Sequence, residues 1–244
     1  MNKAYYLTCM LVTGMLTGAP EPFKIFHRGS TNSGASENTL NAFSTAIAQG
    51  APAIELDIRL CASGELVLHH DDALGRLLPG SGLLAEQTLV QLRSTTMADG
   101  SSIATLRELF ATMPPNTVFV LDIKGDGVAA PLAQLVSNEI TTNGRSIEHF
   151  YATGFMHHEQ VTLKQLLPEL RIVPAIPGSV HELAHYATAM GAYGICLVNL
   201  PGCISEALVA DARQHDIQIW MYQPKGMPNF WVDRLKPDAI IADY

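Results

Sequence analysis

Hydrophobic and polar positions alternate along this chain with two different periods. Short apolar runs and every-second-residue patterns, which are typical of strands, alternate with longer stretches whose apolar residues recur three or four apart, as in helices. The principal predicted strands cover residues 23–27, 53–60, 117–124, 149–155, 171–176, 193–199, 217–222 and 239–243. The predicted helices between them cover residues 39–49, 83–94, 103–113, 130–141, 159–167, 180–190, 205–214 and 229–235. A short strand at 65–70 extends the second principal strand through a turn at Ser63 and Gly64.

This alternation predicts an α/β fold in which parallel strands are joined by helical crossovers. Eight strand and helix units in about 220 residues fit a small closed (β/α)8 barrel, the TIM barrel. An open, doubly wound sheet has the same periodicity, but no glycine-rich dinucleotide motif follows the first strand. The last predicted strand ends at residue 243, so we expect a barrel that lacks or replaces its last helix. No shift in composition marks a linker, and residues 20–244 are therefore predicted to form one barrel domain.

Residues 1–19 differ from the rest of the chain. Asn2 and Lys3 precede an apolar stretch from residue 4 to residue 16, which is the outline of a secretory signal peptide, although Pro20 would hinder cleavage after Ala19. A signal peptide would make the protein secreted or periplasmic. A native N-terminal helix packed against the end of the barrel would leave it cytoplasmic. The stretch is too short to form a stable membrane span, which takes about 20 apolar residues.

Composition and charge narrow the classes of partner. Hydrophobic residues make up 48% of the chain, which is enough for a sizeable core. The formal net charge is −8, from 15 Lys and Arg against 23 Asp and Glu, and no basic run of five or more residues occurs. We therefore expect no nucleic-acid partner and no general affinity for anionic lipid, although a few local cations can still bind a small anion. None of the four cysteines belongs to a CxxC pair, which argues against a zinc ribbon. The oligomeric state does not follow from the sequence.

Two predicted strands carry charged residues on one face of an apolar run. Glu55 and Asp57 share a face of the second strand, and Asp122 and Lys124 share a face of the third, because a strand points every second residue the same way. Buried carboxylates are costly unless they are paired or bind a metal. These residues therefore indicate a cation site next to an anionic ligand.

Other polar residues fall at strand ends, where the functional groups of such barrels lie. The first strand ends in His27 and Arg28, and the short added strand ends in His70. Three carboxylates suit one hard cation, Mg²⁺ or Ca²⁺, and Arg28 and Lys124 suit a phosphate. Two histidines suit proton removal and delivery near neutral pH. Together these groups are what cleavage of a small-molecule phosphodiester needs.

The same residues carry a resemblance to a known family. In chain order the motifs are His27-Arg28-Gly29, Glu37-Asn38-Thr39, Gly50-Ala51, Ile54-Glu55-Leu56-Asp57, His70-Asp71 with Leu74 and Arg76, Asp122-Ile123-Lys124 and Asp238-Ala239-Ile240-Ile241-Ala242-Asp243. From about Lys24 to Tyr244, the chain resembles the glycerophosphodiester phosphodiesterase (GDPD) family. The resemblance implies a catalytic (β/α)8 barrel, one divalent metal ion, and hydrolysis of glycerophosphodiesters to an alcohol and glycerol 3-phosphate.

Carried over residue by residue, the resemblance assigns roles to seven positions. It implies that His27 and His70 are the acid and base of catalysis, that Glu55, Asp57 and Asp122 bind the metal, and that Arg28 and Lys124 contact the phosphate. Trp220 is predicted as a wall of the substrate pocket, with ordinary filling of the barrel as the alternative. Attack by water and attack by the substrate's own 2-hydroxyl through a cyclic phosphate both fit these roles.

The chain departs from the family pattern at several positions. Asp122 stands where many members have Glu, and in this it is similar to the sphingomyelinase D enzymes. Gly154-Phe155 stands where Ser-Phe is common, and Trp220-Met221-Tyr222-Gln223 replaces the more usual Trp-Thr-Val-Asn. His157 and His158 are expected in a solvated loop after the fourth principal strand.

Three alternatives to the leading hypothesis stay open from the sequence. One is a sphingomyelinase D-like phospholipase that forms a cyclic phosphate, and another is a diesterase for a sugar phosphodiester. The third is a catalytically silent, phosphate-binding barrel. The pair His27 and His70 argues against the silent barrel, because binding alone does not need two acid/base groups.

Overall fold

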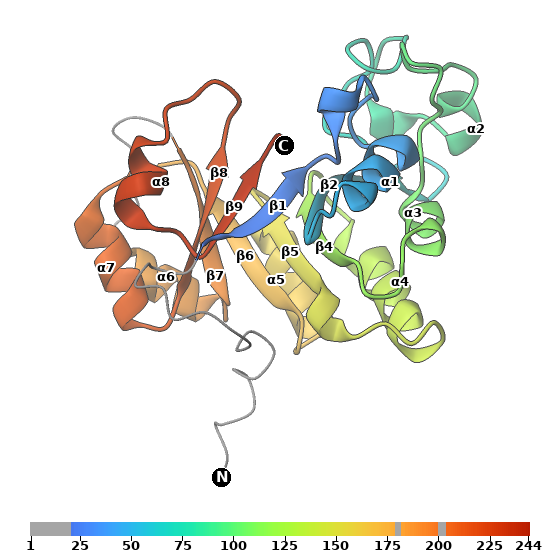
Figure 1. Ribbon diagram of the computed structural model, residues 1–244. Coiled ribbons are helices and arrows are strands. Elements are labelled where there is room, and N and C mark those ends of the chain that lie inside the picture. Colours follow the sequence, from blue (N-terminus) through green and yellow to red (C-terminus); the bar gives the residue numbers. More distant parts are fainter. Residues whose placement is uncertain (1–20, 179–181, 200–203) are drawn as a thin grey trace.

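Eight parallel strands close into a barrel in the computed structural model, which describes residues 21–178, 182–199 and 204–244 (Figure 1). The sheet has nine described strands, of which β3 lies outside the ring: β1 Phe23–His27, β2 Ala53–Leu60, β3 Leu66–Leu68, β4 Val118–Ile123, β5 Phe150–Gly154, β6 Arg171–Ile176, β7 Gly194–Val198, β8 Gln218–Gln223 and β9 Ala239–Ala242. Hydrogen-bonded neighbours follow the order β1-β9-β8-β7-β6-β5-β4-β2, and the pairing of β1 with β2 closes the ring. The predicted TIM barrel is therefore confirmed.

Helices connect these strands and cover the outside of the ring (Figure 1). The α-helices are α1 Leu40–Ala48, α2 Leu89–Leu92, α3 Leu106–Thr112, α4 Ala129–Thr141, α5 His157–Leu166, α6 Leu183–Ala189, α7 Glu206–Gln214 and α8 Phe230–Leu235. Short 3-10 turns lie at η1 Thr31–Ser33, η2 Leu84–Glu86 and η3 Ile147–His149. Outward-facing residues of the strands, such as Leu56 on β2 and Phe119 on β4, are fully buried in the core beneath the helices.

The predicted helix over residues 83–94 is wrong, because the chain breaks there into η2 and α2. Gln87 between them is extended, with φ −100° and ψ 137°. Thr88 then starts a new helix through a capping box, in which its side chain accepts from the amide of Gln91 and the Gln91 side chain accepts from the amide of Thr88. The capping signal at Thr88 therefore overrides the helical spacing of the apolar residues.

The strand β3 lies outside the ring and pairs antiparallel with β2 alone among the described strands. The register joins Ile58 to Leu68 and Leu60 to Leu66. Gly64, with φ 89°, allows the tight reversal between the two strands. This ribbon carries the chain back from the C-terminal end of β2 to the level of Ile58 and Asp57, where residue 70 follows.

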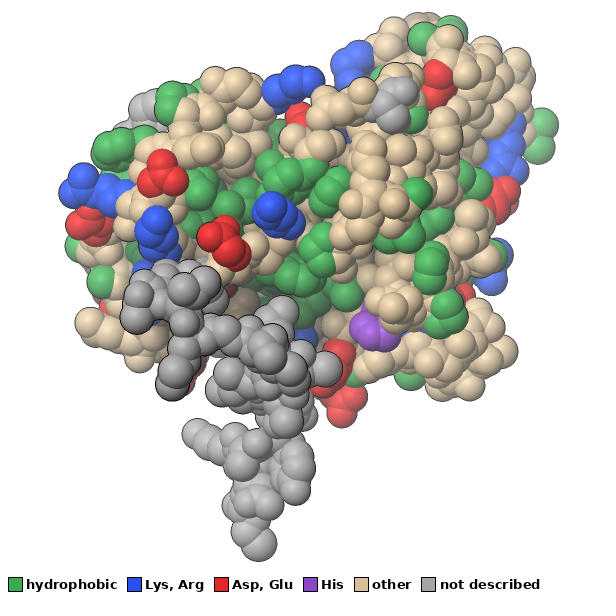
Figure 2. Space-filling model, viewed as in Figure 1, with side chains coloured by type: hydrophobic (Ala, Val, Ile, Leu, Met, Phe, Trp, Pro, Cys, Tyr) green, Lys and Arg blue, Asp and Glu red, His purple; other side chains and the backbone are tan. Residues whose placement is uncertain are grey.

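Only Asp243 and Tyr244 follow β9 in this sequence. A groove of about 570 Å³ lies beside α8, with Lys24 of β1 and Ile240 of β9 among its lining residues. Figure 2 shows hydrophobic side chains gathered in the middle of the face on which β1 and β9 lie. Residues 1–19, for which a signal peptide or a covering helix was predicted, lie outside the described residues. None of the described helices is long and apolar enough to cross a membrane.

Candidate active site

A cavity of about 330 Å³ opens at the C-terminal ends of the barrel strands. Its lining combines charged and apolar side chains, namely His27, Arg28, Glu55, His70, Asp122, Lys124, Thr153, Phe155, Ala175, Cys196, Val198, Tyr222 and Ile241. Six of these residues are among the eight predicted from the sequence. The structure thus brings together both histidines, both predicted phosphate ligands and two of the three predicted metal ligands around one space. Asp57 is fully buried among them.

The three acidic residues form one cluster through the register of β2 and β4. Asp57 pairs directly with Asp122 across the two strands, and Glu55 is the next inward-facing residue of β2. Each of the three carboxylates offers an oxygen, and these oxygens all lie within 4.8 Å of one another. Burial, the neighbouring Asp57 and Asp122 raise the pKa of Glu55 well above its usual value. The three carboxylates therefore repel one another, and a cation bound between them would relieve this repulsion.

Two cations lie directly against these carboxylates. Lys124 Nζ lies 2.6 Å from Asp122 Oδ2 and 3.1 Å from Asp57 Oδ1. Arg28 Nε lies 3.0 Å from Asp57 Oδ2. Burial disfavours ionisation of Asp57, but Lys124 and Arg28 outweigh this effect and lower its pKa. Burial raises the pKa of Asp122 to about 6 in spite of Lys124.

The donor set fits a hard divalent cation. Asp122 Oδ1 is buried and receives no hydrogen bond from the described residues. Three carboxylates from two adjacent strands supply the oxygen ligands that Mg²⁺ and Ca²⁺ prefer. A buried carboxylate oxygen without a donor is rare in proteins and calls for a partner such as an ion or water. Glu55, Asp57 and Asp122 are therefore the residues that could hold such an ion.

The backbone of the β1 loop supports this cluster. Arg28 has a left-handed φ of 55°, and its amide donates to Glu55 Oε2 at 3.0 Å. Asn38, also left-handed with φ 59°, donates from Nδ2 to Asp57 Oδ2 at 2.7 Å and accepts from the Asp57 amide at 3.0 Å. The role of Asn38 in holding Asp57 was not predicted. Its signal in the sequence is the tolerance of Asn for the left-handed region.

Each cavity histidine is held at Nδ1 by a carboxylate. His27 Nδ1 lies 2.8 Å from Asp243 Oδ1, and His70 Nδ1 lies 2.8 Å from Asp71 Oδ1. In both rings Nε2 is thus the nitrogen left for a substrate. Burial lowers the pKa of His70, although Asp71 acts in the opposite direction. The hydrogen bond from His27 lowers the pKa of Asp243.

Arg76 connects the acidic residue that holds His70 with the acidic residue that holds Arg28. Its Nε donates to Asp71 Oδ2 at 2.5 Å, and its Nη2 donates to Glu37 Oε1 at 2.7 Å. The same Glu37 oxygen accepts from Arg28 Nη1 at 2.9 Å. A continuous path of charge-assisted hydrogen bonds therefore runs from His70 to Arg28 through residues far apart in the sequence.

Arg59 holds the main chain at His70. Its Nε and Nη2 donate to the carbonyl oxygen of His70 at 3.0 and 2.8 Å. Arg59, which lies on β2, thus fixes the main chain that follows β3 at the rim of the barrel. Neither Arg59 nor Asp71 was singled out from the sequence for such a role.

Trp220 lies beneath the cavity and is absent from its lining. The ring is 3% exposed, and its Nε1 donates to Gln218 Oε1 at 3.2 Å. Tyr222, the next inward-facing residue of β8, lines the cavity, and its ring centroid is 4.9 Å from that of His27. The structure thus places Trp220 in the packed layer that fills the barrel, which was the alternative interpretation of its position.

His157 and His158 start helix α5 and do not lie in a loop. His157 Nε2 lies 2.9 Å from the carbonyl oxygen of Ala175, and Nδ1 lies 2.5 Å from the hydroxyl of Tyr186. Only His158 is exposed, and it lies 2.8 Å from Asp126. The loop prediction is therefore wrong, because the helix begins two residues earlier than the apolar spacing indicated and His157 fastens it to β6.

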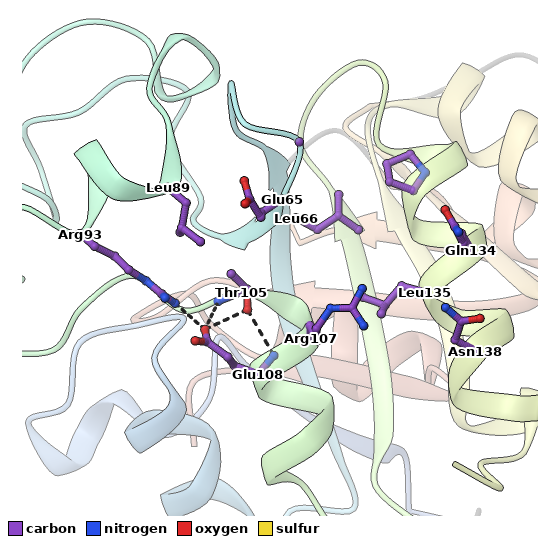
Figure 3. A pocket seen from close by; sticks show the side chains of 12 residues that line it. Glu65, Leu66, Leu89, Arg93, Thr105, Arg107, Glu108, Gln134, Leu135 and Asn138 are labelled. Carbon is purple, nitrogen blue, oxygen red and sulfur yellow. Dashed lines mark hydrogen bonds and ion pairs between the residues drawn. The ribbon is translucent and has the colours of Figure 1, made fainter. Parts of the chain in front are cut away.

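Two other places in the described residues gather polar groups, but their acidic side chains have partners of their own. Asp126, His158 and Glu159 could hold an ion by spacing alone, yet Asp126 lies 2.8 Å from His158, and Glu159 accepts from the amides of Gly127 and Ala129 at the start of α4. A hollow of about 420 Å³ lies on the outer wall, and Figure 3 shows that Glu108 there binds Arg93 and Thr105. The barrel mouth is therefore the better candidate for chemistry.

Comparison with known proteins shows which family the chain resembles. Residues 27–244 match the model of the glycerophosphoryl diester phosphodiesterase family. A glycerophosphodiester phosphodiesterase of Caldanaerobacter subterraneus subsp. tengcongensis is 28% identical over 179 residues, which are 70% of this chain and 73% of that protein. Glycerophosphodiester phosphodiesterase 1 of Bos taurus is 35% identical over 116 residues, which are 43% of this chain and 35% of that protein.

Solved structures share the same barrel. A phosphodiesterase of Oleispira antarctica, determined in complex with its product sn-glycerol-3-phosphate, superposes with a TM-score of 0.77 at 22% identity and covers 92% of this chain and 94% of its own. A glycerophosphodiester phosphodiesterase of Thermotoga maritima superposes with a TM-score of 0.71 at 24% identity, covering 93% of this chain and 96% of its own. At these identities the superpositions establish the fold.

Proposed function

This chain belongs to the glycerophosphoryl diester phosphodiesterase family, a family of phosphoric diester hydrolases, and from that premise we propose a metal-dependent, two-histidine reaction at the barrel mouth. The substrate is a glycerophosphodiester, and the products are an alcohol and glycerol 3-phosphate. The observation that carries this proposal is the common cavity lined by His27, His70, Arg28, Lys124 and the acidic cluster. The product bound to the Oleispira antarctica phosphodiesterase supports glycerol 3-phosphate as the retained half.

The charged side chains account for binding of the phosphate. Glu55, Asp57 and Asp122 would hold one divalent ion, which when bound supplies positive charge next to the phosphoryl oxygens. Arg28 and Lys124 contact the same carboxylates and line the cavity, so they can also reach the non-bridging oxygens of a diester bound there. These cations would offset the charge that develops on the phosphoryl group in the transition state.

The two imidazoles account for proton transfer. One takes the proton of the attacking hydroxyl, either of water or of the substrate's own 2-hydroxyl, and the other gives a proton to the oxygen of the leaving alcohol. Asp243 and Asp71 each hold a ring at Nδ1, which fixes the ring orientation and reserves Nε2 for the reaction. Burial keeps the pKa of His70 low, which favours its neutral form at neutral pH.

Product analysis tests the proposal. The full chain is incubated with glycerophosphocholine, glycerophosphoinositol and a lysophospholipid, each with Mg²⁺ or Ca²⁺, and the phosphorus NMR spectrum is followed over time. The proposal expects free glycerol 3-phosphate from a glycerophosphodiester. Accumulation of a cyclic phosphate from the lysophospholipid as final product would favour the sphingomyelinase D-like reaction, for which Asp122 is the supporting residue. Absence of any turnover with either metal would leave the phosphate-binding barrel and a diesterase for a sugar phosphodiester.

A further inference from the structure

Gly154 ends β5 directly beside the carboxylate of Asp122. A Cβ atom placed on Gly154 would lie 2.3 Å from Asp122 Oδ1 and 3.0 Å from the carbonyl oxygen of Ile123. The first distance is far shorter than a van der Waals contact, which for carbon atoms is about 3.5–4.0 Å. A side chain at residue 154 and the present position of the Asp122 carboxylate therefore exclude each other.

The carboxylate cannot move away without losing a contact. Asp122 Oδ2 lies 2.6 Å from Lys124 Nζ, and rotation of the short side chain would separate these two atoms. Oδ1 is the buried oxygen that receives no hydrogen bond from the described residues. The atom that a residue at 154 would displace is thus an oxygen of the acidic cluster that is still available for a ligand.

The backbone at Gly154 is also held in place. Its φ of 110° is a conformation that residues with a Cβ rarely adopt. Gln160, fully buried on α5, donates from Nε2 to the carbonyl oxygen of Gly154 at 2.8 Å. On the preceding residue, Thr153 Oγ1 donates to the carbonyl oxygen of Val173 at 2.7 Å. The α-carbon of Gly154 therefore stays where it leaves room for Asp122.

We infer that Gly154 is a positioning residue of the metal site, because its lack of a side chain sets where Asp122 presents its oxygen to the ion shared with Glu55 and Asp57. This inference rests on the proposed function, since it assumes that these carboxylates bind a divalent ion.

A double-mutant cycle on the full chain tests the inference through metal affinity. The variants are Gly154→Ala, Asp122→Ala and the combination of both, and Mg²⁺ and Ca²⁺ are each titrated into the protein calorimetrically without substrate. Gly144→Ala is the matched control, because Gly144 also has a positive φ, 72°, and a Cβ there would meet nothing within 4 Å. Melting temperatures of all variants separate the strain of the backbone from the contact with Asp122.

The expected result is a loss of about 10- to 100-fold in metal affinity for Gly154→Ala, as for other residues that orient metal ligands. In the Asp122→Ala background the same change at 154 should lower affinity no further. Gly144→Ala should bind metal like the wild type. If the wild type binds an ion and Gly154→Ala binds it equally well, the inference is overturned while the metal site stands.

Two other outcomes are also decisive. If the wild type binds neither ion, the proposed metal site fails, and the positioning role falls with it. If Gly154→Ala does not fold, the combined variant decides: folding of Gly154→Ala/Asp122→Ala supports the contact, since removing the carboxylate relieves it. Failure of both variants to fold would assign the effect to the backbone at Ile123 and overturn the inference.

Discussion

The same strands form both ends of the barrel interior, but one end carries the charged residues of the cavity and the other is packed with apolar side chains. At the mouth, inward-facing Glu55 and Tyr222 line the cavity, whereas Ala53 and Trp220, two residues earlier on β2 and β8, are buried in an apolar layer. Inward-facing residues only two positions apart on one strand therefore belong to different layers, the apolar base of the barrel and its charged mouth. Residues that stabilise the fold and residues suited to chemistry are thus separated along the barrel axis, as in other barrels of this kind.

The charges at the two ends differ in how completely they are satisfied. Near the base, Arg171 donates from Nη1 to the hydroxyl of Tyr151 at 2.8 Å, and its guanidinium lies 4.9 Å from the ring centroid of Tyr193. At the mouth, Asp122 Oδ1 is buried without a hydrogen bond from the described residues. A charged side chain with a hydrogen-bond partner among aromatic rings stabilises the fold. A buried carboxylate oxygen without a donor instead calls for a partner such as an ion or water.

The largest effect is expected from removal of the metal. Chelation with EDTA should reduce turnover to the level without enzyme, because the acidic cluster at the mouth would then repel an anionic diester. Adding Mg²⁺ or Ca²⁺ back should restore turnover, while the melting temperature should change much less than activity does. Turnover that is indifferent to the chelator would remove the metal from the mechanism.

The next largest effect is expected from the two histidines. His27→Ala and His70→Ala should each lower kcat/KM by about 10²- to 10⁴-fold, the usual contribution of general acid–base catalysis. The melting temperatures should stay close to that of the wild type. His185→Ala, a change on the exposed face of α6, serves as control and should leave kcat/KM unchanged. Full turnover of a diester by both cavity variants would refute the acid–base roles.

A smaller effect, on stability and not on catalysis, is expected at the base. Trp220→Ala should lower the free energy of unfolding by about 3–5 kcal/mol, since a large buried ring is lost from a packed layer. Urea unfolding measures this change, and kcat/KM below the melting range should stay near that of the wild type. Tyr222→Ala should show the reverse, a raised KM with a smaller loss of stability. A raised KM for Trp220→Ala with unchanged stability would assign Trp220 to the pocket after all.

The smallest effect concerns the half-exposed ion pairs of Arg76. Burial acts against ionisation of Asp71, but hydrogen bonds from Arg76 and His70 lower its pKa to about 2, below the 3.8 of the unfolded chain. The pair therefore stabilises the fold fully above pH 3.8, and this stabilisation is lost as the pH falls through about 2. Arg76→Gln should cost no more than about 1 kcal/mol at neutral pH, because exposed pairs are screened by solvent.

Denaturation of the wild type and of Arg76→Gln at several pH values measures this difference in stability. The two proteins should converge at acidic pH. Arg107→Gln is a suitable control, because Arg107 is an exposed residue on the outer wall and lies away from the cavity lining. A difference between wild type and Arg76→Gln that grows as the pH falls would contradict the assignment.

The ring could be predicted because its signals are local. Each strand is a short apolar run bounded by turn residues, and the alternation of Glu55 and Asp57 with apolar neighbours marks which face of β2 is inward. Convergence of the strand ends then followed from the barrel itself, which is why the predicted acidic cluster and histidines meet in one cavity. The prediction of one helix over 83–94 is wrong because Thr88 and Gln91 form a capping box that starts a new helix inside this range.

The supports of the site could not be predicted because they depend on contacts between distant segments. Asp243 is 216 residues away from His27, and only closure of the ring puts the two side chains together. Glu37 and Arg76 are 39 residues apart and meet through an irregular loop. No period in the sequence encodes such pairings, and the same holds for the contact of Gly154 with Asp122.

The ribbon of β3 carries one of the two cavity histidines outside the hydrogen-bonded ring of strands. His70 follows β3, which pairs with β2 alone among the described strands, and residues 71–103 then run as an excursion before the chain returns to α3. All ladder hydrogen bonds of the eight ring strands lie outside this excursion. Replacing this excursion would therefore leave the ladder of the ring intact, but it would remove Asp71 and Arg76, which hold His70 and Glu37 in place.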